Sequence, residues 1–282
     1  MRIDIWSDVI CPYCWIGKRH LESALADFRG KNPGAEVEVV WRAFELDPDA
    51  PVQATETTPQ MLSRKYGVPL ERAEAMQRQM AATFEGLGLE FNWREAKVCN
   101  SFDAHRLAAL ARARGLADAV DEALKKAHFT DGEEIADHAV LRRIGRDTGL
   151  PDAEVTELLD GDGYADEVRR DIEAARQIGI GGVPFFVFGG RLAVNGAQPV
   201  DVFRQALDQA WEEERKSFAN LTGVGGAGAA GAGAAGAGAA GAGAAGAADS
   251  AAGAADGSAT DSTATDSTAT DGPDCSDGSC SI

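Results

Sequence analysis

The hydrophobic and polar positions of the first 57 residues follow two different periods. Residues 2–9 (RIDIWSDV) alternate and are β-branched, which is typical of a strand, and residues 35–46 (AEVEVVWRAFEL) have the same character. Between them, residues 14–28 place apolar side chains at helical spacing, and Gly30 and the Asn32-Pro33-Gly34 turn follow. Because a helix between two strands is the usual parallel crossover, this stretch predicts a βαβ unit.

A helical period replaces this pattern from residue 58 to about 178. Seven amphipathic segments follow one another there, and most of them end on glycine, the usual helix stop. Residues 179–199 then predict two short strands around the turn Gly189-Gly190, and residues 200–218 predict a closing helix.

Together these elements predict an α/β chain with a thioredoxin-like fold and an inserted all-helical domain. Residues 1–57 and 179–221 form the thioredoxin-like part, and residues 58–178 form the insertion.

The last 61 residues have a different composition. Residues 222–282 carry a Gly/Ala block with a GAGAA period and then DSTAT repeats, which cannot bury a core. We therefore expect a disordered, acidic, Gly/Ala-rich tail. It ends in a CxxxxC pair, Cys275 and Cys280. A flexible linker of 52 residues, 223–274, spans roughly 40 Å. We therefore predict that this pair is an auxiliary redox partner of the two cysteines near the start of the chain, Cys11 and Cys14. A pair that binds metal loosely or has no function is the alternative.

Charge narrows the range of partners. The net charge is −18, and the tail contributes seven aspartates and no Lys or Arg, which leaves 38 acidic and 27 basic residues in the body. Only seven of the basic residues are lysines. This composition indicates a halophilic protein or an ordinary acidic one. An acidic surface repels nucleic acid and anionic membranes, so we expect neither as a partner.

The start of the chain bears on the compartment. Met1 to Asp4 lead straight into the strand without the apolar stretch of a secretory signal, and no apolar run approaches the ~20 residues of a membrane helix. We expect a cytoplasmic protein. In a reducing compartment, closely spaced cysteines are more often catalytic or metal-binding than structural.

Cys11 and Cys14 form a CxxC motif at the junction of the first strand and helix. The helix N-terminus stabilises a thiolate on Cys11, which predicts a pKa between about 3.5 and 7.5. A zinc site needs two further ligands, and Cys99 and His105 are too isolated in sequence to supply them. The pattern favours redox exchange without a metal or other cofactor, while metal-binding and structural roles remain alternatives.

A second signal is the Gly-Val-Pro sequence ending in Val183 and Pro184. Proline has no backbone N–H to donate to a neighbouring strand, so a proline within a predicted strand calls for an explanation. A cis Val183–Pro184 bond beside the dithiol would leave the Val183 backbone available to an extended substrate, whereas a trans proline would only mark the start of a strand.

Three segments carry a resemblance to a known family. WSDVICPYCWIGK, CNSFDAHRL and GIGGVPFFVFGGRLAVNGAQP resemble the FrnE-like branch of the DsbA family, over about residues 1–218. The resemblance implies thiol-disulfide oxidoreductase or isomerase activity on protein disulfides, with Cys11 as nucleophile, Cys14 as resolving cysteine and Pro184 as the cis-proline. The dipeptide Pro12-Tyr13 departs from the Pro-His of the secreted oxidases, so we expect a less oxidising pair than the about −120 mV of the strong oxidant.

The middle segment supplies further candidates. Asn100 or Ser101 is expected to cap the helix that contains His105, and Cys99 is most simply a buried small hydrophobe. In the resembled family this segment faces the active site. We therefore count Asn100 and His105 as candidate substrate-binding residues, against the simpler interpretation of a cap and a helix-face histidine.

The residues around the dithiol complete the expected substrate-binding set. Pro12, Tyr13, Trp15 and Val183 belong to it, and Trp15 is expected to be partly exposed.

Two other classes of function share parts of this pattern. The first class comprises glutathione-dependent 2-hydroxychromene-2-carboxylate isomerases and kappa-class transferases. These proteins resemble the chain in the order of their strands and helices, but they typically carry serine at the position of Cys11. A holdase chaperone with an incidental dithiol is the non-enzymatic alternative. The expected partners are protein disulfides or thiols, with glutathione or another small thiol as a further possibility.

Overall fold

The computed structural model describes residues 1–222 and 280–281. In chain order the elements are β1 (Arg2–Ser7), α1 (Pro12–Lys31), β2 (Glu38–Ala43), α2 (Thr58–Tyr66), α3 (Leu70–Gly86), α4 (Phe102–Ala113), α5 (Ala117–Phe129), α6 (His138–Asp147), α7 (Asp152–Asp160), α8 (Ala165–Gln177), β3 (Gly182–Val183), β4 (Phe185–Phe188), β5 (Leu192–Asn195), α9 (Val200–Thr222) and β6 (Cys280–Ser281).

Four strands form the central sheet in the order β2-β1-β4-β5. β1 and β2 are parallel, with Ile3 opposite Val39, which confirms the βαβ unit. β4 runs antiparallel to both β1 and β5. The turn between β4 and β5 has positive φ angles of 57° and 69° at Gly189 and Gly190, which suits a tight hairpin that matches strand twist. The predicted hairpin is therefore confirmed.

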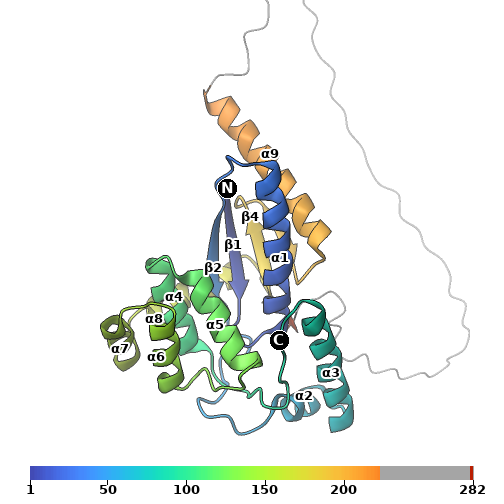
Figure 1. Ribbon diagram of the computed structural model, residues 1–282, viewed down its shortest axis with the longest axis vertical. Coiled ribbons are helices and arrows are strands. Elements are labelled where there is room, and N and C mark those ends of the chain that lie inside the picture. Colours follow the sequence, from blue (N-terminus) through green and yellow to red (C-terminus); the bar gives the residue numbers. More distant parts are fainter. Residues whose placement is uncertain (223–279, 282) are drawn as a thin grey trace, which may run out of the picture.

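Helices α1 and α9 pack side by side over one face of this sheet (Figure 1). The core between them is aliphatic and aromatic because the strands direct alternate residues to this face. Its fully buried members include Ile3, Ile5, Phe186, Phe188 and Phe203. This core fixes the start of α1, where the CxxC motif lies.

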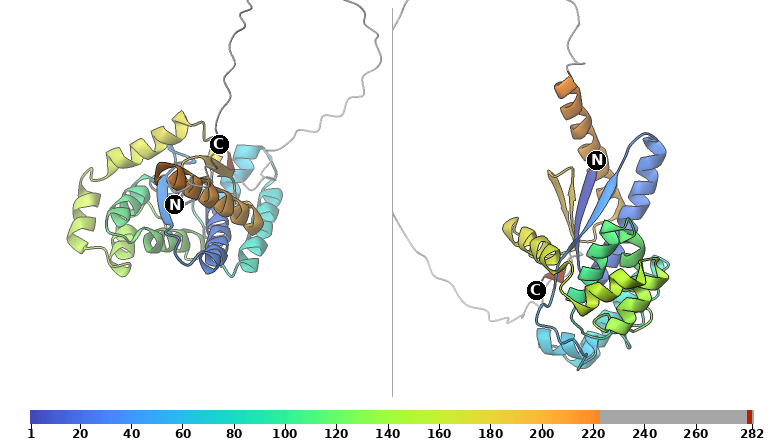
Figure 2. Two further views of the ribbon diagram at one scale, coloured as in Figure 1. Left: turned by 90° about the horizontal axis from the view of Figure 1, so that it is seen from above. Right: turned by 90° about the vertical axis from the view of Figure 1, so that its left-hand side faces the viewer.

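The seven helices between β2 and β3 form the predicted helical region. Figures 1 and 2 show α4 to α8 gathered beside β2, with α2 and α3 near the opposite side of α1. α4 and α8 contact β2 directly. The region has its own apolar core, which includes Leu107, Leu124 and Ile135, all fully buried. The α/β class with a helical insertion is thus the observed architecture.

Buried charges join the helical region to the sheet side of the molecule. Lys18 of α1 and Lys125 of α5 are 1% and 0% exposed, and both ammonium groups lie 5.1 Å from the centroid of the Trp41 ring. Both pair with the buried carboxylate of Asp121, at 3.3 Å for Lys18. Burial alone would lower the pKa of Lys18, but Asp121 and its neighbouring carboxylates raise it. This cluster fixes α5 against α1.

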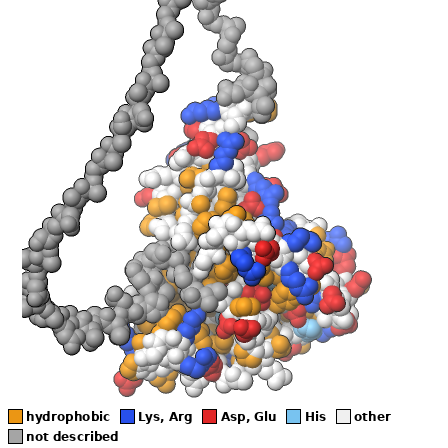
Figure 3. All heavy atoms as spheres, turned by 180° about the vertical axis from the view of Figure 1, so that it is seen from behind, with side chains coloured by type: hydrophobic (Ala, Val, Ile, Leu, Met, Phe, Trp, Pro, Cys, Tyr) orange, Lys and Arg blue, Asp and Glu red, His pale blue; other side chains and the backbone are white. Residues whose placement is uncertain are grey.

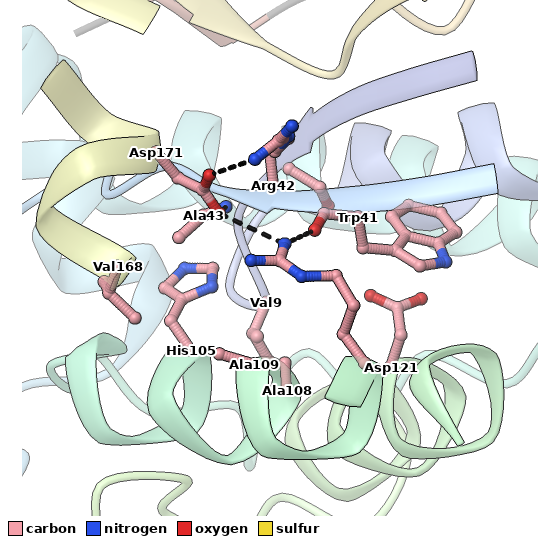
Figure 4. A pocket seen from close by; sticks show the side chains of 12 residues that line it. Val9, Trp41, Arg42, Ala43, His105, Ala108, Ala109, Asp121, Val168 and Asp171 are labelled. Carbon is pink, nitrogen blue, oxygen red and sulfur yellow. Dashed lines mark hydrogen bonds and ion pairs between the residues drawn. The ribbon is translucent and has the colours of Figure 1, made fainter. Parts of the chain in front are cut away.

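A second polar cluster lies under β2 (Figure 4). Arg112 of α4 donates to the carbonyl of Trp41 and lies 3.2 Å from the Asp171 carboxylate, which also pairs with Arg42 at 2.7 Å. The groups surround a small cavity of about 20 Å³. His105 rises into the same layer from α4. These hydrogen bonds and ion pairs hold helices α4 and α8 against strand β2.

The outer surface carries both signs of charge. In Figure 3 the Lys and Arg side chains are interspersed with Asp and Glu over the part of the surface that the helical region forms. None of the helices in the described part of the chain is long and apolar enough to span a membrane. The predicted disordered linker and Cys275 lie outside the described residues.

Candidate active site

Cys11 lies at the N-cap of α1. Its backbone is extended (φ −90°, ψ 114°), and Pro12 opens the helix, where a missing N–H costs nothing and the fixed φ fits. The backbone N–H of Cys14 donates to the carbonyl of Cys11 at 3.1 Å. The first turn carries no acidic side chain, so nothing there offsets the positive end of the helix dipole. This position favours a thiolate on Cys11.

The two active-site cysteines are buried thiols. Cys11 is 0% and Cys14 1% exposed, and neither is in a disulfide. They pack with Phe44, Ile180 and Val183. A substrate sulfur therefore reaches Cys11 only when a group covering it moves.

The Val183–Pro184 segment lies directly against the nucleophile. The Cys11 thiol donates to the carbonyl oxygen of Val183 at 3.5 Å, and the Val183–Pro184 peptide bond is cis. Gly17 of α1 makes this approach possible. A Cβ there would lie 3.1 Å from Pro184 Cγ and 3.0 Å from Phe186 Cζ. Residues far apart in sequence thus meet at one point.

Asp8 supports the loop between β1 and Cys11. Its carboxylate is fully buried and accepts from the backbone N–H of Leu46 at 2.7 Å, and it lies 3.3 Å from Nε2 of His105. Burial would raise the pKa of this carboxyl, but the contacts with His105 and Leu46 hold it below its ordinary value. The loop before Cys11 is therefore tied both to the chain after β2 and to helix α4.

His105 differs from its expected position in the substrate groove. It is 6% exposed, and its Nε2 lies 3.0 Å from the carbonyl oxygen of Phe44 as well as close to Asp8. Asn100 caps α4 by accepting from the N–H of Phe102 at 2.9 Å and donates to the carbonyl of Pro48. Both side chains hold loops beside the site, and Ser101 makes no side-chain cap.

The expectation that Trp15 is partly exposed is wrong. Trp15 is 2% exposed and stacks on Phe129 with a ring-centroid distance of 5.9 Å, while Phe84 meets it edge-on at 5.6 Å. Its indole N–H donates to the Glu122 carboxylate at 3.2 Å. Helices α3 and α5 cover this face of α1, so Trp15 anchors the helical region and lies away from the groove.

A groove of about 780 Å³ shares part of its wall with the apolar cluster that contains the cysteines. Phe44 and Ile180 belong both to its wall and to the cluster around Cys11. Arg169 and Arg176 of α8 and the half-buried Glu45 supply charge. Burial raises the pKa of Glu45. His105 opposes this rise, and the carboxylate of Asp8 adds to it. Tyr13 is partly buried and packs near the cysteines.

Sequence reasoning did not identify Asp8, Glu45 or the arginines of α8 as parts of this region. The only signal for Asp8 was a carboxylate at the end of an apolar strand, directly before the CxxC motif. Cys99 is a buried small residue as expected, and burial raises the pKa of its thiol to about 11. Residues 1–222 and 280–281 contain no group of three or more His, Cys, Asp or Glu side chains placed to bind a metal.

Comparisons with known proteins place this geometry in a family. The model of the DSBA-like thioredoxin domain matches residues 2–208. A probable DsbA oxidoreductase from Streptomyces coelicolor is 41% identical, with a TM-score of 0.71 over 76% of this chain and 91% of that chain.

Two further proteins are similar to this chain at lower identity. The protein YwbO of Bacillus subtilis is 26% identical over 218 residues, which are 77% of this chain and 98% of the relative. The cytosolic disulfide reductase DsbM from Pseudomonas aeruginosa, solved with GSH, is 19% identical, with a TM-score of 0.54 over 75% of this chain and 100% of that chain, and shares the fold. The chain belongs to the DsbA-like thioredoxin family.

Proposed function

We propose that this protein is a thiol-disulfide oxidoreductase or isomerase that acts on protein disulfides through Cys11 and Cys14. The observation that carries the proposal is the contact of 3.5 Å between the Cys11 thiol and the carbonyl of Val183, at a helix N-terminus. The helix N-terminus is what favours a thiolate on Cys11. The contact supports the proposal by its proximity, because Val183 belongs to a backbone segment that can pair with an extended peptide.

The proposed reaction has two exchange steps. The Cys11 thiolate attacks one sulfur of a substrate disulfide, which forms a mixed disulfide and releases the other substrate sulfur as a thiolate. The Cys14 thiolate then attacks the Cys11 sulfur and releases the second substrate thiolate. Two electrons have passed to the substrate, and Cys11 and Cys14 end as a disulfide. Oxidation of a substrate is the same sequence in reverse.

The substrate-binding residues follow from this chemistry. Val183 offers backbone groups, Pro12 and Tyr13 lie within the motif, and the groove beside Phe44 accepts neighbouring side chains of the substrate. Asn100 and His105 act by holding the walls of the site. Protein disulfides or thiols are the proposed substrates, and glutathione is a candidate small-thiol partner.

The variant Cys11→Ser tests the proposal against its alternatives. It should abolish insulin reduction while leaving the far-UV circular dichroism unchanged. If the parent protein shows no disulfide turnover and Cys11→Ser still conjugates glutathione or isomerises a glutathione-dependent substrate, the isomerase or transferase class is favoured. Retained suppression of aggregation, with no turnover in the parent, would favour a holdase.

The reduction potential of the pair decides the direction of electron flow. Because Tyr13 replaces the histidine of the secreted oxidases, we expect a value below the about −120 mV of the strong oxidant. A value near the cytosolic glutathione poise, roughly −220 to −320 mV, supports a reductase or isomerase in the cytoplasm. Membership of the FrnE-like branch and a cytoplasmic location are parts of this proposal.

Exchange between the terminal cysteine pair and the active site is a separate part of the proposal. Cys275 lies outside the described residues, and Cys280 belongs to β6. Two electrons would pass from the Cys275–Cys280 dithiol to the Cys11–Cys14 disulfide, so that the terminal pair is oxidised as the active site is reduced. Mapping of mixed disulfides in a Cys14→Ser variant tests this step. A complete absence of Cys11 bonded to Cys275 or Cys280 contradicts it.

A further inference from the structure

Residues 280–281 pair with the strand that precedes the cis-proline. β6 pairs antiparallel with β3, with Gly182 opposite Ser281 and Val183 opposite Cys280. β3 is not part of the central sheet, and β6 is its pairing partner among the described strands. A segment remote in sequence therefore ends at the active site.

Val183 connects this pairing to the nucleophile. Its carbonyl oxygen accepts from the Cys11 thiol at 3.5 Å, and the same residue faces Cys280 in the strand register. Val183 and Cys11 are both 0% exposed in the structure that contains this strand. A protein substrate that docks along Val183 needs the backbone edge that Cys280–Ser281 already holds.

We propose that the C-terminal residues of this chain are the resident occupant of the peptide-docking edge Gly182–Val183 and compete there with protein substrates. This inference rests on the proposed function, because it assumes that substrates dock on the same edge. An extended peptide adds to an exposed strand through main-chain hydrogen bonds, which are available to any sequence. Cys280 and Ser281 have small side chains, and neither is a proline, so both keep the backbone groups that such pairing uses.

The expected strength follows from the connection within one chain. Two paired residues bind weakly, but a segment on the same chain competes at an effective concentration of up to about 1 mM. For a pairing with a dissociation constant on the order of 0.1–1 mM, the KM for a protein substrate rises about two- to tenfold. The kcat at saturating substrate stays unchanged, because the occupant is displaced.

The test compares the full-length chain with a variant that cannot pair. Ser281→Pro removes an N–H and restricts the backbone of β6, and Ser258→Pro is the matched control outside the described residues. All chains carry Cys275→Ser and Cys280→Ser, so that disulfide chemistry of the terminal pair plays no part. The readouts are amide hydrogen exchange at Gly182 and Val183 and the KM for insulin.

We expect Ser281→Pro to speed exchange at one or both of these amides about two- to tenfold and to lower KM by a similar factor, while Ser258→Pro changes neither. Addition of the peptide DGSSSI should restore the protection. Equal exchange rates in all chains overturn the proposal, and so does protection that disappears on dilution, which assigns the strand to a second copy. If no chain reduces insulin but Ser281→Pro still loses protection, the occupant is confirmed and the proposed function fails.

Discussion

Substitution of Asp8 by asparagine tests the support beneath the active site. The carboxylate is fully buried, accepts from Leu46 N–H at 2.7 Å and lies 3.3 Å from His105 Nε2. Hydrogen bonds to charged groups contribute about 1.5–3 kcal/mol each, and a buried unsatisfied donor costs about 1–3 kcal/mol. Asparagine keeps one acceptor and places an NH₂ where the second acceptor was. We expect Asp8→Asn to lower the free energy of unfolding by about 2–4 kcal/mol at pH 7.

The stabilisation by Asp8 should depend on pH in a defined direction. The native pKa of Asp8 is lowered, below the value of about 3.9 for an unfolded aspartate. Its stabilisation is therefore complete above about pH 4 and is lost as the pH falls through the native pKa. The difference between the parent and Asp8→Asn should be constant from pH 7 to about pH 5 and shrink in more acidic solution.

Urea unfolding of the reduced proteins, at fixed high salt and several pH values, measures the difference. Asp166→Asn is the control, because Asp166 is exposed on α8 and pairs only with Arg169 among the described contacts. It should change stability by less than about 0.5 kcal/mol. A loss in Asp8→Asn no larger than in this control, or a loss that grows in acid, would refute the reasoning.

Three further predictions concern reactivity, packing and salt. At mildly acidic pH, iodoacetamide should label Cys11 before Cys14 or Cys99, whose pKa burial raises to about 11, and mass spectrometry that finds equal labelling contradicts a reactive Cys11. Gly17→Ala should cost about 1–3 kcal/mol through overpacking and slow turnover, whereas Gly30→Ala, with no atom within 4 Å of its added Cβ, should be neutral or stabilising in the same urea assay. If the acidic surface is a halophilic adaptation, the melting temperature should fall as salt decreases below molar levels, because carboxylates then repel without screening; a salt-independent melting temperature removes this interpretation.

Most of the fold could be predicted because the apolar side chains of each strand or helix repeat at the spacing typical of that element. β1 and α1 switch from strand to helix spacing at Cys11, and the seven helices of the insertion repeat an amphipathic pattern that mostly ends on glycine. The hairpin required the two consecutive glycines that its turn uses. These signals are local, so they can be recognised without knowledge of the tertiary arrangement.

The contacts between these elements could not be predicted in the same way. Lys18 and Lys125 are charged and would ordinarily be placed on the surface, yet they are buried around Trp41 and Asp121. Trp15 is buried because α3 and α5 cover it, a consequence of how the insertion folds back.

The site was predictable to the extent that motifs mark it. Cys11, Cys14 and Pro184 stand in sequence patterns with a chemical reason, and the structure brings Cys11 to Val183. The partner of β3 was not predictable, because a strand of two residues has no period to recognise.

Trapping of the mixed disulfide tests the central claim most directly, namely that exchange begins at Cys11. In Cys14→Ser that also carries Cys275→Ser and Cys280→Ser, neither Cys14 nor the terminal pair can resolve the mixed disulfide, so the first intermediate should accumulate when the reduced variant is mixed with insulin. We predict insulin bonded to Cys11 through one disulfide, found by peptide mapping, and no adduct when Cys11→Ser is added to the same background. An adduct at Cys99 instead of Cys11, or no adduct at all, would contradict the account.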